Sequence, residues 1–166
     1  MPEVAVPLTI RDLTTEDLPV CPWLASAPYL ASVAEGLARA RRGEADYLVV
    51  CAPSGLPVAL GGADYSQTLG AGRLEHLEVH AVLHSCGIGT LLIQAVERRI
   101  RAHGLPCAEL KVEESNPRAR ALYERLGYVA CGRQPASWDR QSADGSLSRY
   151  ETVCTLMCKD LPSSAG

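Results

Sequence analysis

The chain has 166 residues, of which 47% are hydrophobic and 21% charged, and its formal net charge is −3. This length predicts one domain over residues 1–166, with an ordered part at about 8–160. The weakly acidic balance excludes the basic surface of a nucleic-acid-binding protein, and no apolar stretch is long enough to span a bilayer. We therefore expect neither nucleic acid nor a membrane as a partner.

The first half of the chain alternates between strand and helix signals. Thr14 is a helix cap followed by acidic residues, and Gly43 ends a helix that carries basic residues in its last turn. Gly61 and Gly62 lie inside a strand pattern, which predicts a bulge or a close backbone approach. The predicted elements are a strand at 8–11, a short helix after Thr14, a helix at 29–42, and strands at 47–52, 56–63 and 73–80.

The second half continues the alternation. Asn116 caps a helix that has Pro117 at its first position and Gly127 just after its end. The other predicted elements are a helix at 87–103, a strand at 107–112, and strands at 128–133 and 149–159 joined by a polar loop. The order predicts one α+β domain built around a mixed sheet.

The seven cysteines are spread without a metal-ligand spacing, and no Cys-x-x-Cys pair occurs. The first residues lack the basic segment and apolar run of a secretory signal. The sequence therefore predicts a cytoplasmic protein with reduced thiols, most of them small core residues, and no bound metal.

Residues 77–90, LEVHAVLHSCGIGT, run from an apolar alternation through a glycine loop into a helical pattern. This arrangement binds phosphate groups, because the first N–H groups of a helix lack internal partners and the helix dipole adds positive charge there. Gly87 and Gly89 would let an anion approach the backbone closely. Taken alone, the stretch is equally compatible with a simple turn.

A second segment, 116–128, has the sequence NPRARALYERLGY. Together the two segments resemble the GCN5-related N-acetyltransferase (GNAT) family. Its pattern is a strand ending in apolar-x-Val, a loop Gln/Arg-x-x-Gly-x-Gly/Ala, and downstream Asn-x-x-Ala-x-x-Leu-Tyr-x-x-x-Gly-Phe/Tyr. The matching residues are Leu77, Val79, Gly87, Gly89, Asn116, Ala119, Leu122, Tyr123, Gly127 and Tyr128. Two positions depart from the pattern: His84 replaces Arg or Gln, and Ala81 replaces a frequent proline.

The resemblance implies a single-domain GNAT-like fold, with a mixed, mostly antiparallel sheet of about seven strands flanked by about four helices. It also implies acetyl-CoA as co-substrate and places the pantetheine arm beside the backbones of Leu77 and Val79, with Glu78 between them. Asn116 is a helix cap that the resemblance also places on the coenzyme. The remaining predicted coenzyme-binding residues, around the pyrophosphate, are His84, Ser85, Cys86, Gly87, Ile88, Gly89 and Thr90.

For catalysis, the resemblance implies that Tyr123 is the general acid near the coenzyme sulfur, whereas helical spacing alone predicts a core aromatic. The general base is predicted to be Glu75, which matches the base of polyamine acetyltransferases, or His76, whose ordinary pKa suits the task. The alternative for both is a solvated or structurally paired strand residue. A water chain is a further alternative to any single base. Other members use a glutamate at the position of Lys111, and a lysine is normally protonated.

The resemblance therefore implies an N-acetyltransferase that moves an acetyl group from acetyl-CoA to a primary amine by direct attack. The acceptor would be a small-molecule or peptide amine, and a homodimer is one possible state because dimers are common in the family. The alternative is a non-catalytic acyl-CoA-binding sensor or regulatory domain. The candidate aromatic residues for an acceptor pocket are Trp23, Tyr29, Tyr65 and Trp138.

Overall fold

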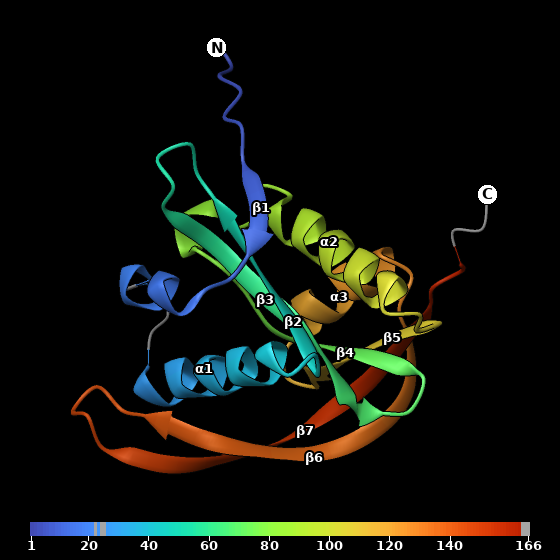
Figure 1. Cartoon of the computed structure of the whole chain (residues 1–166). Coiled ribbons are helices and arrows are strands. Elements are labelled where there is room, and N and C mark those ends of the chain that lie inside the picture. Colours follow the sequence, from blue (N-terminus) through green and yellow to red (C-terminus); the bar gives the residue numbers. More distant parts are fainter. Residues whose placement is uncertain (22, 24–25, 164–166) are drawn as a thin grey trace.

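In the computed structural model, which describes residues 1–21, 23 and 26–163, seven strands form one sheet in the order β1-β2-β3-β4-β5-β7-β6 (Figure 1). The β4·β5 pair is parallel and the other neighbours are antiparallel. The strands are β1 (Thr9–Asp12), β2 (Ala45–Cys51), β3 (Pro57–Thr68), β4 (Ala71–Val79), β5 (Cys107–Glu113), β6 (Val129–Gln141) and β7 (Leu147–Asp160). The helices are η1 (Thr15–Val20), α1 (Ala27–Arg41), η2 (Ala81–Leu83), α2 (Ile88–Ala102) and α3 (Pro117–Arg125). The predicted mixed, mostly antiparallel sheet flanked by helices is therefore confirmed.

The strand β2 is buried on both faces of the sheet, and it shows how one strand contributes to two cores. Its residues Leu48 and Val50 pack with α2, while Tyr47 and Val49 pack with α1 and η1. This alternation follows from the two-residue period of a strand. It places α1 on one face of the sheet and α2 on the other, with α3 packed against the α2 core.

Strands β4 and β5 pair over a short distance and then separate. Their register covers Ala71↔Cys107, Gly72↔Ala108 and Arg73↔Glu109, after which no further pairing occurs between these two described strands. The rest of β4 therefore presents a backbone edge that β5 does not cover. Near this opening lie α3 and the loop that precedes α2.

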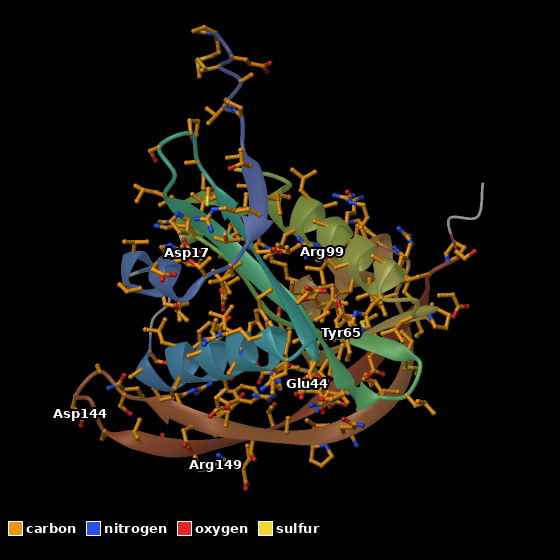
Figure 2. All side chains as sticks on the ribbon, in the orientation of Figure 1. Asp17, Glu44, Tyr65, Arg99, Asp144 and Arg149 are labelled. Atoms are coloured by element: carbon orange, nitrogen blue, oxygen red, sulfur yellow. A yellow bond between two sulfur atoms is a disulfide. The ribbon has the colours of Figure 1, made fainter. Side chains whose placement is uncertain are left out.

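The predicted polar loop between the last two strands is mostly a strand hairpin. Strands β6 and β7 pair continuously from Gly132↔Leu156 to Gln141↔Leu147, and the hairpin curves beneath α1 (Figure 1). The sequence analysis missed it because most side chains from Pro135 to Gln141 are exposed, so no buried face imposes an apolar alternation. Asp144 lies at the hairpin tip and Arg149 on its outer side (Figure 2), where Arg149 pairs with Asp139 at 3.2 Å.

The prediction that the thiols are reduced is wrong for two cysteines. Cys131 and Cys158 form a disulfide between β6 and β7, with their Cα atoms 6.1 Å apart. A register shift between Ala130 and Gly132 places the extra residue, Cys131, beside β7. The pairing depends on this register, and 27 residues separate the cysteines in sequence, so their spacing alone could not reveal it. The remaining cysteines are free.

We expect Cys131→Ser to lower the melting temperature. A cross-link over 27 residues contributes about 3.5 kcal/mol in the chain-entropy model, or roughly 7–14 °C in Tm for a domain of this size. Thermal unfolding with and without dithiothreitol measures the effect, and Cys107→Ser, which removes a free thiol, is the control. If reduction left the wild-type Tm unchanged, the disulfide would make no contribution to stability.

None of the described helices is long and apolar enough to cross a membrane.

Candidate active site

A groove of about 570 Å³ runs along the uncovered edge of β4, between the loop before α2 and helix α3. It brings together most of the predicted coenzyme residues. Those lining the groove are Leu77, Glu78, Val79, His84, Ser85, Gly87, Gly89, Thr90 and Asn116. Two predicted residues do not line it: the Ile88 side chain is buried in the core at 5% exposure, and Cys86 is exposed to solvent.

The loop before α2 has the backbone shape that an anion site requires. Gly87 caps the helix with φ 82°, a left-handed conformation that favours glycine. Gly89 lies in the first turn, and a Cβ added there would meet only Val79 Cγ2, at 3.9 Å. Internal packing therefore does not demand a glycine at this position. The space fits a ligand that approaches the first amides of α2.

Cationic groups border the same groove. Arg118 Nη2 donates to Ser85 Oγ at 2.6 Å, which ties α3 to the loop, and Arg125 lines the groove further along α3. Ser85 has φ 64°, unusual for a residue with a side chain, so this bond fixes a strained backbone. The sequence analysis missed Arg125, because a basic residue in the last turn of a helix is an ordinary capping feature.

The His84 ring is directed to the end of β4. Its Nε2 lies 2.8 Å from the Val79 carbonyl oxygen, and because a carbonyl only accepts, Nε2 must carry a proton. The ring thus closes the loop against the strand. The Asn116 side chain accepts from the Ala119 N–H at 3.1 Å, which confirms its capping role. Contact of Asn116 with the coenzyme stays a prediction.

A second cavity, of about 490 Å³, adjoins the groove where β4 and β5 separate. Its walls come from α1, β4, β5, α3 and the β6–β7 hairpin. Both cavities are lined by Leu77, Glu78, Asn116 and Ala119. They therefore meet near the C-terminal end of β4, on its uncovered edge.

Tyr123 lies on the wall of this second cavity, on the inner side of α3. Burial, and then the negative charge of Glu78, raise the pKa of its hydroxyl. The side chain therefore keeps its proton at neutral pH, as a general acid must. Its ring also contacts Tyr128 edge-on, with centroids 6.2 Å apart.

A bulge in β4 orients the two residues predicted as bases. Leu60 pairs with Glu78, but Gly62 pairs with Glu75, so β4 holds one extra residue, and His76 has φ 55°. Glu75 accepts from the Tyr47 hydroxyl and pairs with Arg39 at 2.8 Å. The Tyr47 ring can approach Glu75 because residue 62 is a glycine. A Cβ added at Gly62 would lie only 2.7 Å from that ring.

His76 is equally engaged on both sides of its ring. Its Nε2 lies 2.8 Å from Ser32 Oγ and its Nδ1 lies 3.0 Å from the Tyr47 hydroxyl. Burial is the main cause that holds the pKa of His76 below its usual value, so the ring is neutral at pH 7. Glu75 and His76 thus border the second cavity as members of a hydrogen-bonded network with α1.

Two of the four candidate aromatic residues line the second cavity, namely Tyr29 and Trp138. Trp23 instead donates to the Pro57 carbonyl at 3.2 Å and packs against His80. Tyr65 stacks on His103, with ring centroids 3.9 Å apart, and its hydroxyl donates to Asp46 (Figure 2). The Trp23 and Tyr65 side chains are thus structural.

The chain is similar in fold to several solved structures of acetyltransferases. The chain is 21% identical to the ribosomal-protein-S18-alanine N-acetyltransferase from Escherichia coli, with 96% of each chain covered and a TM-score of 0.71. It is 18% identical to a phosphinothricin acetyltransferase from Sinorhizobium meliloti in complex with AcCoA (96% of this chain, 91% of that one, TM-score 0.70). It is 19% identical to a spermidine N-acetyltransferase SpeG chimera from Vibrio cholerae and hSSAT (92% and 95%, TM-score 0.70).

The family comparison agrees with these folds. The model of the acetyltransferase (GNAT) family matches residues 9–128, which is most of the chain and includes both segments around the groove. The protein therefore belongs to the acetyltransferase (GNAT) family.

Proposed function

We propose that the protein transfers the acetyl group of acetyl-CoA to a primary amine by direct attack, with coenzyme in the groove and amine in the second cavity. The observation that carries this proposal is the junction of the two cavities at Leu77, Glu78, Asn116 and Ala119. A thioester held along the β4 edge and an amine in the second cavity would meet there. Holding both reactants in one place supplies much of the rate enhancement of such a transfer.

The chain offers partners for each part of the coenzyme. The uncovered edge of β4 suits the amides of a pantetheine arm. The first amides of α2, with Arg118 and Arg125 nearby, suit the pyrophosphate. Tyr123 is the proposed donor of a proton to the departing thiolate, because its raised pKa keeps it protonated.

The general base predicted from the sequence, Glu75 or His76, stays a prediction. The Glu75 carboxylate is held in an ion pair with Arg39, and both ring nitrogens of His76 are already engaged. These contacts favour a supporting role for both residues.

The acceptor is proposed as a primary amine on a small molecule or a peptide. Structural relatives are described as acting on alanine of a ribosomal protein, on spermidine and on phosphinothricin. The second cavity presents carboxylates and the aromatic rings of Tyr29 and Trp138, a combination that suits a protonated amine.

The proposal is tested in two steps. Calorimetric titration with acetyl-CoA is expected to give micromolar binding at one site per chain. Thiol release is then measured with spermidine, phosphinothricin and an alanine-initiated peptide as acceptors, and at least one of these amines should stimulate it. Failure to bind acetyl-CoA at millimolar concentration, or binding without thiol release from any of the amines, would contradict the proposal.

A further inference from the structure

Three carboxylates line the second cavity: Glu75, Glu78 and Glu113. Glu75 is paired with Arg39 at 2.8 Å, and Glu113 accepts from the Tyr150 hydroxyl at 2.8 Å. Among residues 1–21, 23 and 26–163, nothing forms a hydrogen bond or an ion pair with the carboxylate of Glu78. Glu75 and Glu113 are each engaged through Oε1, whereas within the described part of the chain both oxygens of Glu78 are free for a ligand.

The bulge in β4 determines where the Glu78 side chain lies. Cα partners across two strands share a face of the sheet, and Glu78 pairs with Leu60, which belongs to the core on the α1 side. Glu75 pairs with Gly62, which itself pairs with Tyr47 of the same α1-side core. In a regular strand, residues three apart would point to opposite faces. The extra residue at the bulge brings Glu75 and Glu78 to the same side.

Glu78 also lies at the junction of the two cavities, since it lines both. The charge of Glu78 acts on tyrosines from two different elements. Burial is the largest cause that raises the pKa of Tyr29 on α1 and of Tyr123 on α3, and the negative charge of Glu78 is the second. The carboxylate is therefore close to the proposed general acid and to the aromatic wall of the acceptor cavity.

The surroundings of Glu78 favour proton uptake. The Glu78 side chain is exposed to the two cavities, but the surrounding protein removes enough water from its carboxylate to raise its pKa, and the nearby His84 acts in the opposite direction. A carboxylate with a raised pKa and free oxygens accepts a proton near neutral pH more readily than one held by an arginine. Partial desolvation and the lack of a paired cation among the described residues thus both favour proton uptake by Glu78.

Building on the proposed function, we propose that Glu78 is the general base that deprotonates the acceptor amine. The first proton of the ammonium passes to the Glu78 carboxylate and then to solvent. The amine lone pair attacks the thioester carbonyl carbon, forming the C–N bond, and collapse of the tetrahedral intermediate breaks the C–S bond. Tyr123 protonates the thiolate, and the second nitrogen proton restores the Tyr123 hydroxyl. The net products are an amide, free coenzyme thiol and one proton.

Other titratable groups face the same space, so the pH profile is interpreted through variants. They are Tyr29 from α1, Glu75 and His76 from β4, Lys111 and Glu113 from β5, Tyr123 from α3 and Cys154 from β7, while His84 faces Glu78 from the loop. A limb of the profile belongs to Glu78 if Glu78→Gln removes it and Glu78→Asp retains it.

The experiment measures thiol release against pH with the most active of spermidine, phosphinothricin and an alanine-initiated peptide. Glu78→Gln is expected to lower kcat/KM by about 10²–10⁴-fold, while the Kd for acetyl-CoA measured by calorimetry stays within about threefold. The wild-type rate should level off above the pKa of the base, whereas the Glu78→Gln rate should keep rising with pH. Glu114→Gln is the matched control, because Glu114 pairs with Arg133 and lines neither cavity.

The outcomes separate this assignment from the proposed function. A wild-type protein that binds acetyl-CoA but releases no thiol would overturn the proposed function and the assignment with it. An active wild type with equally active Glu78→Gln would overturn the assignment alone. If Glu78→Gln raises KM for the amine without lowering kcat, Glu78 binds the cation and is not the base, and the assignment is overturned. The assignment is also overturned if Glu75→Gln removes the limb of the pH profile and Glu78→Gln does not.

Discussion

Gly89→Asp is expected to raise the Kd for acetyl-CoA by at least about 100-fold, a loss of nearly 3 kcal/mol, without lowering the Tm. The added side chain has room, since a Cβ at Gly89 would meet only Val79 Cγ2, at 3.9 Å. An acidic residue in the first turn of a helix also stabilises that helix by about 0.3–1 kcal/mol. The same carboxylate would occupy the groove at the amides proposed to bind the pyrophosphate, so repulsion and steric overlap both oppose the ligand.

A matched control separates the local effect from the change in net charge. Leu91→Asp places the same charge in the first turn of α2, at a side chain that is 51% exposed and outside the groove. We expect it to change the Kd by less than about fivefold, because exposed charges are screened by solvent and salt. Calorimetry and thermal unfolding of both variants provide the measurements. Equal weakening by the two substitutions would show a general charge effect, and unchanged binding in Gly89→Asp would place the pyrophosphate elsewhere.

The elements that the sequence predicted well are those specified by local signals. Asn116 and Pro117 mark the start of α3, and the apolar period of α2 begins directly after Gly87, so the structure has these helices within about one residue of their predicted starts. Caps, glycines and side-chain periods depend on neighbouring residues in the chain. The same is true of the coenzyme groove, because one continuous stretch and one helix contribute nearly all of its lining.

The parts that the sequence could not predict depend on contacts between distant segments. Glu75 lies two and four residues before Leu77 and Val79, so a regular strand would place all three side chains on one face. The bulge at His76 separates them: Leu77 and Val79 pack toward the α2 core, and Glu75 lies with Glu78 on the α1 side. A bulge of one residue reverses every side chain beyond it, and no local pattern gives its position.

The acceptor cavity was still harder to predict, because it is assembled from five elements. Tyr29 comes from α1 and Trp138 from the β6–β7 hairpin, whose strands were predicted only in part. The engagement of Glu75 also depends on Tyr47 and Arg39, which lie about 30 residues earlier in the chain. Side chains that are equivalent in a sequence pattern thus differ in chemistry according to the partners that the fold supplies.

Tyr123→Phe is expected to lower kcat by about 10²–10⁴-fold, the usual contribution of a general acid, while the Kd for acetyl-CoA stays within about threefold. The substitution keeps the ring that packs against Tyr128 and removes only the hydroxyl, so the fold should be retained. Loss of kcat without loss of affinity is the signature of a group that acts in the transition state. A non-catalytic acyl-CoA-binding domain would have no use for this hydroxyl.

Tyr65→Phe is the control for removing a tyrosine hydroxyl. That hydroxyl donates to Asp46 at 2.6 Å, away from both cavities, so its loss should reduce stability and leave kcat unchanged. Single-turnover kinetics of both variants separate acetyl transfer from product release. If Tyr123→Phe transfers the acetyl group at the wild-type rate, Tyr123 has no part in the mechanism. Solvent would then protonate the departing thiolate. If Tyr123→Phe is slow but keeps the limb of the pH profile that depends on Glu78, two separate residues carry the two proton transfers. One residue then removes the proton from the amine, and the other donates a proton to the thiolate.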